Sequence, residues 1–142
     1  MTNTVDILQD KIELFKNEIG TRKLNIEQQK IYSAFTKENG KSIRFAITDC
    51  KGKSLRVTLD PATEVRKILL KHYQEPTGTV TAKEILNMFD IVRTGTKKKE
   101  KGNYVYTKKF VRKRAVYFAV LKLFPNGKDA VLKSFYSNLG YK

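Results

Sequence analysis

A stretch of the C-terminal half, from Arg93 to Arg114, gathers the side chains whose chemistry is most evident in this sequence. It holds ten lysine or arginine residues against a single acid, Glu100, and Tyr104 and Tyr106 lie among the cations. Cations neutralise the phosphates of a nucleic-acid backbone, and aromatic rings stack on its bases or pack against its sugars. The composition of this stretch therefore predicts a surface that binds nucleic acid.

The candidate binding residues are the cations of this stretch, its two tyrosines and two arginines from an earlier segment. The cations are expected to contact phosphates, and the tyrosines to stack on bases. Few Arg, Asn or Gln side chains are grouped for paired contacts to base edges, so low sequence specificity is expected. The full set is Arg93, Lys97, Lys98, Lys99, Lys101, Tyr104, Tyr106, Lys108, Lys109, Arg112, Lys113, Arg114, Arg44 and Arg56.

Positive charge is segregated along the 142 residues, whose formal net charge is +15. Residues 1–40 carry six cations and six acids, residues 41–81 carry eight and four, and residues 82–142 carry fifteen and four. A segregated charge produces a directed field that concentrates a polyanion. Nucleic acid, DNA or RNA, is therefore the favoured partner, and an acidic protein surface is the alternative. A membrane is disfavoured, because the basic segment lacks an amphipathic surface with exposed Trp or Leu.

The rarer residue types restrict the class of protein further. Cys50 is the only cysteine and His72 the only histidine, so neither an intrachain disulfide nor a multi-cysteine metal site is expected. No signal peptide is visible at the N-terminus, and no segment reaches the ~20 apolar residues of a membrane span. These features predict a soluble intracellular protein, either cytoplasmic or associated with the nucleus or nucleoid.

Catalytic motifs are not evident. The Gly-Thr-Val-Thr-Ala-Lys and Gly-Thr-Lys-Lys-Lys segments lack the spacing of a phosphate-binding loop, and there is no Gly-x-Ser-x-Gly motif. A metal-dependent nuclease would need several carboxylates on adjacent elements. Asp49, Asp60 and Glu64 are the only acids near one such junction, and the last two fit a helix cap better. A non-catalytic protein without a cofactor or metal is predicted, with a metal-dependent nuclease as a minor alternative.

Hydrophobic periodicity predicts two helices within residues 1–40. The first covers residues 5–19, and the second starts at Asn25, where Gln28 completes a capping-box pattern. Because their charges balance, these helices are expected to pack as a hairpin that serves as a scaffold, with self-association as the alternative.

Residues 42–59 alternate apolar and polar side chains and predict a β-hairpin. One face of this hairpin would be apolar, and the other would carry Arg44 and Arg56. That second face is interpreted first as a solvated surface. Alternatively, it joins the binding surface together with Lys51 and Lys53.

Two helix starts are predicted after this hairpin. Asp60 and Pro61 fit the cap and first position of one helix, and Thr81 with Glu84 forms a second capping-box pattern. Residues 91–107 then fit either a second hairpin with a lysine-rich tip, which is slightly favoured, or a loop that becomes ordered on a phosphate backbone.

Helical spacing is preferred for the remaining chain. A helix from Thr107 would place Lys108, Lys109 and neighbouring cations in its first half, where a bound phosphate would relieve their conflict with the helix dipole. A last helix would follow the Asn126–Gly127 turn. Because Asn-Gly is also a strong hairpin signal, two strands over residues 115–136 are the alternative.

These observations combine into one prediction of fold and function. The chain is expected to be a single nucleic-acid-binding α+β domain over residues 1–142, mostly helical, with a helical hairpin at 1–40 and a basic α+β body at 41–142. That body would contain one β-hairpin at about 42–59 and a second basic hairpin or loop at about 91–107. The alternatives are a structural RNA-binding protein of a ribonucleoprotein and a small, virus-encoded regulator that docks on an acidic protein surface. The sequence carries no signal for the oligomeric state.

Overall fold

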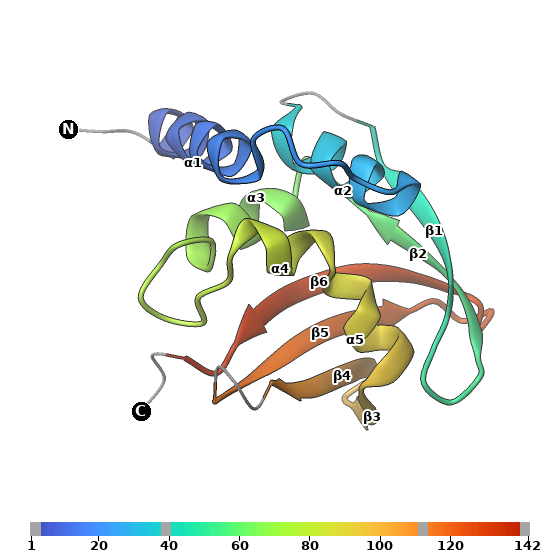
Figure 1. Ribbon diagram of the computed structural model, residues 1–142. Coiled ribbons are helices and arrows are strands. Elements are labelled where there is room, and N and C mark those ends of the chain that lie inside the picture. The colour runs from blue at the N-terminus through green and yellow to red at the C-terminus, as the bar shows by residue number, and fades with distance from the viewer. Residues whose placement is uncertain (1–3, 38–40, 111–113, 140–142) are drawn as a thin grey trace.

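The computed structural model describes residues 4–37, 41–110 and 114–139, and it folds them into one six-stranded sheet with helices on one side (Figure 1). The elements, in chain order, are α1 (Thr4–Ile19), α2 (Ile26–Thr36), β1 (Ile43–Thr48), β2 (Ser54–Leu59), α3 (Glu64–Lys71), α4 (Ala82–Leu86), α5 (Met88–Thr94), β3 (Thr96–Glu100), β4 (Asn103–Phe110), β5 (Ala115–Leu123) and β6 (Asp129–Ser137).

The sheet joins two antiparallel groups of strands. Its order is β1-β2-β6-β5-β4-β3, so β1 and β2 form one hairpin and the last four strands form a meander. A parallel pairing between β2 and β6 connects the two groups, with Arg56 opposite Asp129. Helices α3, α4 and α5 connect the first group to the second, and together with α1 and α2 they cover one face of the sheet (Figure 1).

The core lies between that helix layer and the sheet. Phe15 of α1 stacks on Phe35 of α2 with ring centroids 5.5 Å apart, and Phe45 of β1 meets Phe89 of α5 at 4.9 Å. Buried side chains alternate with half-buried or exposed ones along the strands, as expected for a sheet that is covered on one side only. We call the side of the sheet opposite the helices the open face.

The two helix starts that were predicted from capping boxes are confirmed. Asn25 accepts the backbone N–H of Gln28 at 2.7 Å, and the Gln28 side chain accepts the N–H of Asn25 at 3.0 Å. Thr81 and Glu84 make the same reciprocal pair at the start of α4. The predicted hairpin at 42–59 is also confirmed, as β1 and β2.

Two other helix predictions need adjustment. Helix α3 begins at Glu64 rather than at Pro61, because Asp60 accepts the backbone N–H of Ala62 at 2.9 Å and closes a turn instead. The helix expected to continue from the Thr81 cap is divided at Asn87 into α4 and α5. Neither α4, α5 nor any other helix of the described part is long and apolar enough to cross a membrane.

The predicted fold class, mostly helical with one hairpin, is wrong. The segments from Thr107 and after Asn126 that were expected to be helices are instead strands β4, β5 and β6. In β5 the inward positions are buried, whereas Val116 and Val120 lie on the opposite face. A turn with Gly127 at φ +71° joins β5 to β6, so the hairpin alternative is the structure that forms.

The basic segment at 91–107 also forms a hairpin, although its limits are shifted. Helix α5 extends to Thr94, and β3 pairs with β4 around a turn in which Lys101 and Gly102 have φ +48° and +83°. Gly95 connects α5 to β3. A Cβ atom there would lie 2.4 Å from the carbonyl oxygen of Thr107, so the close approach of helix and strand requires glycine.

Candidate nucleic-acid interface

Strand alternation divides the basic stretch between the two sides of the sheet. Lys97 is paired with Tyr106 and Lys99 with Tyr104, and paired residues point to the same side of a sheet. This side is the helix-covered one, because Tyr106 is buried in the core. Lys98 points the opposite way, to the open face. The continuous lysine track expected from the sequence is therefore split.

Asp49, at the end of β1, holds the basic hairpin to the β1–β2 turn. Its Oδ2 accepts hydrogen bonds from the Lys97 Nζ and the Tyr106 hydroxyl, both at 2.8 Å. Its Oδ1 accepts the backbone N–H groups of Lys51 and Lys53, both at 2.9 Å. We call this arrangement the Asp49 clasp. It gives Lys97 and Tyr106 a structural role in joining two hairpins.

The electrostatics of the clasp agree with its geometry. Burial alone would raise the pKa of Asp49, but the hydrogen bonds from Lys97, Tyr106 and the two backbone groups outweigh it and lower the pKa to about 2. Burial, together with the carboxylate of Asp49, raises the pKa of Tyr106 well above its ordinary value. Tyr106 is 0% exposed, so the stacking role that the sequence suggests for it does not fit this structure.

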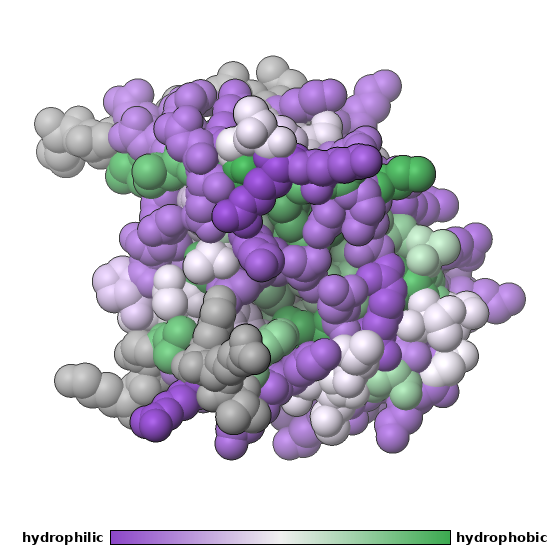
Figure 2. Space-filling view, viewed as in Figure 1, coloured by the Kyte–Doolittle hydropathy of each residue, from purple (hydrophilic) through white to green (hydrophobic). Residues whose placement is uncertain are grey.

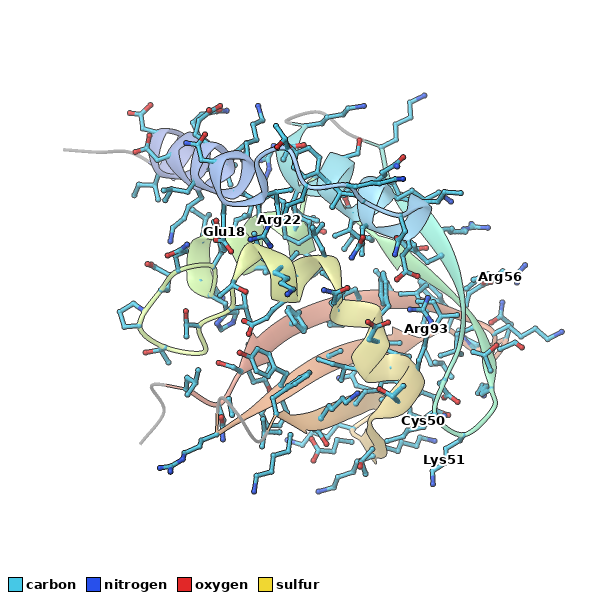
Figure 3. All side chains as sticks on the ribbon, in the orientation of Figure 1. Glu18, Arg22, Cys50, Lys51, Arg56 and Arg93 are labelled. Carbon is cyan, nitrogen blue, oxygen red and sulfur yellow. The ribbon has the colours of Figure 1, made fainter. Side chains whose placement is uncertain are left out.

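Other predicted cations also lie on the helix side. Arg93 of α5 forms ion pairs with Glu27 of α2 and with Asp90, and Figure 3 shows it within the helix layer. Lys108 donates to the Thr94 hydroxyl at 2.7 Å. Their contacts with phosphate remain predictions, and in this structure both side chains hold neighbouring elements together.

Tyr104 and the turn residues complete the predicted set. Tyr104 is half-buried, and the Lys97 ammonium lies 4.0 Å from its ring centroid. Lys101 and Arg114 are exposed in the turns at the two ends of β4. The phosphate site expected at a helix start near Thr107 is ruled out, because these residues belong to a strand. Arg112 and Lys113 lie outside the described residues.

The open face collects one exposed cation from every strand of the sheet. Two of the six have acidic neighbours: Arg56 pairs with Asp129 at 2.6 Å, and Lys98 pairs with Glu100 at 3.1 Å. Lys133 belongs to this face because it is the extra residue of a bulge in β6, beside Ser134 and opposite Val120 of β5. From β1 to β6 the cations are Arg44, Arg56, Lys98, Lys109, Lys122 and Lys133.

The two further lysines of the first hairpin lie elsewhere. Lys51 is exposed at the tip of the β1–β2 turn, where Figure 3 shows it pointing away from the rest of the molecule. Lys53 points to the helix side, with its Nζ 5.8 Å from the ring centroid of Tyr104. Of the four cations that were considered on this hairpin, Arg44 and Arg56 lie on the open face, whereas Lys51 and Lys53 do not.

The centre of the open face is apolar and aromatic. Phe118 of β5 and Tyr136 of β6 are directly paired, and their rings stack with centroids 5.0 Å apart and planes inclined by 12°. His72, which ends α3, stacks on Tyr136 at 5.4 Å. Half-buried valines surround these rings, at positions Val105, Val116, Val120 and Val131.

The imidazole of His72 contacts both the α3–α4 loop and β6. Burial lowers its pKa, and the charge of Lys71 contributes in the same direction, against a hydrogen bond to the Thr77 carbonyl that raises it. Nδ1 lies 3.3 Å from that carbonyl oxygen. The three rings His72, Tyr136 and Phe118 thus form a row that runs from the end of α3 across β6 to β5.

The aromatic pair and two of the cations were missed from the sequence. Phe118, Tyr136, Lys122 and Lys133 all lie in segments that were predicted to be two separate helices, so they were not expected to meet on one face of a sheet. The signal that could have identified them is the alternation along β5 together with the Asn126–Gly127 turn.

The helix side contains a cavity whose lining residues already make structural hydrogen bonds. Between α4, α5 and β5 lies a cavity of about 230 Å³. The Tyr117 hydroxyl donates to Glu84 at 2.5 Å there, and the same carboxylate caps Thr81. In the view of Figure 2, hydrophilic side chains cover most of the surface and hydrophobic areas are small.

Within the described ranges, no three His, Cys, Asp or Glu side chains lie close enough together to hold a metal ion. Comparison with protein-family models, curated proteins and solved structures finds no match for this chain.

Proposed function

We propose that this protein binds nucleic acid non-catalytically, through phosphate contacts made by the open face of its sheet and with low sequence specificity. The observation that carries the proposal is the contribution of one exposed cation by each strand to a single surface. Among the described residues of the six strands, two acids, Glu100 and Asp129, share this surface with six cations, so its net charge is positive. Such a surface attracts a polyanion and orients it across the strands.

The dimensions of the face suit several phosphates. Neighbouring strands are about 4.8 Å apart, so six strands span roughly 24 Å. One strand of B-DNA carries one phosphate per about 3.4 Å of helix axis, so about seven phosphates pass over this width, which is enough for four contacts. Four is also the number of open-face cations that remain after Arg56 and Lys98 are assigned to their ion pairs. We expect log K to fall with log salt at a slope of about −3 on a single strand.

The test compares two variants that lose the same charge on opposite sides of the molecule. Lys109→Gln with Lys122→Gln removes two cations from the open face. Lys23→Gln with Lys83→Gln removes two exposed cations from the helix side. Fluorescence anisotropy with labelled oligonucleotides, measured over a range of NaCl concentrations, gives the salt slope of each protein.

We expect the open-face variant to reduce the slope on a single strand to about −1.4 and the helix-side variant to leave it near −3. Equal effects of both variants would contradict a localised surface, and a slope near zero for the unmodified protein would contradict the electrostatic proposal. Tight binding of structured RNA with weak binding of single strands would favour the ribonucleoprotein alternative. Capture of an acidic protein that survives nuclease treatment would favour the regulator alternative.

A further inference from the structure

We propose that the nucleic acid bound by the open face is single-stranded, with one base stacked on the ring of Phe118. This inference depends on the proposed function and adds to it the class of substrate and the position of a base. It rests on the row of three rings that runs from the end of α3 across β6 to β5, and on the cations beside the end of this row.

The row leaves one ring face in position for a base. Tyr136 lies between His72 and Phe118, with centroid distances of 5.4 Å and 5.0 Å. Phe118 therefore turns one face toward β6 and the other toward β4. The residue paired with Phe118 on β4 is Thr107, and the next position across, on β3, is Thr96.

These two threonines leave room at the end of the row. Both are small side chains, and the strands that carry them are about 4.8 Å apart. A base placed against Phe118 would lie above Thr107 and extend the row by one ring. Stacking of this kind accepts every base, because each has a π face, and this agrees with low sequence specificity.

Two cations flank this position along the strands. Lys109 lies two residues beyond Thr107 on β4, and Lys98 is paired with Val105, two residues before Thr107. Two residues of a strand span about 6.7 Å, so both ammonium groups lie within reach of the phosphates on either side of a stacked nucleotide. The Lys98–Glu100 ion pair is solvent-exposed and would exchange readily for a phosphate contact.

Single-strandedness follows from the geometry of stacking. In a duplex the faces of the bases are covered by their neighbours, and a side chain on a flat sheet reaches only backbone and groove edges. A base that stacks on Phe118 must be unstacked from its own strand, as in protein surfaces that bind single strands. A duplex would contact only the cations of the open face, through its phosphates, without stacking on Phe118.

The test uses the full chain with 2-aminopurine-labelled oligonucleotides, because the fluorescence of this base changes when it leaves the stack of its own strand. Four probes of matched sequence are compared: single-stranded DNA, single-stranded RNA and the duplex form of each. The variants are Phe118→Leu, which removes the ring, and Phe118→Tyr, which keeps it. Phe124→Leu is the matched control, since Phe124 is 44% exposed and lies beyond the end of β5.

We expect a change in 2-aminopurine fluorescence on single strands only, and a preference for single strands over duplex. Phe118→Leu should weaken single-strand binding by about 5- to 150-fold with no change in salt slope, while Phe118→Tyr and Phe124→Leu bind as the unmodified protein does. The relative affinities of the DNA and RNA probes show which of the two nucleic acids the protein prefers.

The inference is overturned if Phe118→Leu binds single strands normally, or if it weakens duplex and single-strand binding equally. In that case a retained salt slope of about −3 would leave the proposed function standing. Absence of salt-dependent binding to any probe would overturn both. Loss of binding by Phe118→Tyr as well as Phe118→Leu would also reject stacking, because the ring is present in the first variant.

Discussion

Replacing Asp49 by Asn should destabilise the fold by a predictable amount. Asparagine keeps the size of the side chain and one oxygen for the backbone N–H groups of Lys51 and Lys53. It replaces the carboxylate oxygen that accepts from Lys97 and Tyr106 with a donor or with an uncharged acceptor. The buried ammonium of Lys97 would then lose its charge partner.

The magnitude follows from the pKa of the carboxyl group. Its lowering from 3.8 to about 2 corresponds to about 2 kcal/mol of stability at pH 7. Removing one partner of a buried pair costs an amount in the same range, so we expect Asp49→Asn to cost about 3 kcal/mol. For a chain of this length the melting temperature should fall by about 10 °C.

The effect should also depend on pH in a defined direction. Because the pKa of Asp49 is lowered in the folded state, its contribution is fully present above the unfolded value of 3.8 and is lost as the pH falls toward 2. The difference in unfolding free energy between the two proteins should therefore shrink by about 1 kcal/mol between pH 7 and pH 3. Urea denaturation followed by circular dichroism at both pH values measures it.

Asp90→Asn is the control for this experiment. Asp90 also pairs with a cation, Arg93, at 3.0 Å, but its side chain is 57% exposed, so its replacement should change stability by less than about 0.5 kcal/mol. If Asp49→Asn were as mild as Asp90→Asn, or if its cost were the same at pH 3 and pH 7, the clasp would not hold the hairpins together as described.

Two neighbouring lysines of β3 should respond in opposite ways. Lys97→Gln removes the charge partner of Asp49 and should cost about 2–3 kcal/mol in urea denaturation, with little effect on nucleic-acid binding by the molecules that stay folded. Lys98→Gln should leave stability within about 0.5 kcal/mol and reduce the magnitude of the salt slope of binding by up to about 0.7, because its side chain is exposed on the open face. Similar behaviour of the two variants would contradict the division of the basic stretch between two sides.

The features predicted correctly from the sequence are those whose causes are local. The capping boxes at Asn25 and Thr81 depend on residues three positions apart, and both form. The first hairpin is also local, since its strands alternate clearly and are joined by a short turn. In each case the residues that decide the structure are neighbours in the chain.

The C-terminal strands were mispredicted because their stabilising contacts are distant in sequence. Ala115, Phe118 and Ala119 fit the spacing of an apolar helix face as well as that of a strand. The choice is decided by partners that the periodicity does not reveal, including the parallel pairing of β6 with β2, in which Arg56 lies opposite Asp129.

The chemistry of the candidate site was easier to predict than its location. The excess of cations and the presence of aromatic rings are visible in composition. Their distribution is set by strand register, which turns Lys98 to one side and Lys97 to the other, and by Asp49, which is 57 residues from Tyr106 in sequence. Without the register, the buried and exposed rings could not be distinguished.

The most direct test of the central claim is to map where nucleic acid contacts the protein. Titration of the ¹⁵N-labelled chain with a short single-stranded oligonucleotide, followed by amide chemical shifts, reports each residue separately. We expect the largest shifts in β4, β5 and β6 around Thr107, Phe118 and Tyr136, and small ones in α1 and α2. Shifts confined to the helix layer, or to the tip of the β3–β4 hairpin, would contradict it.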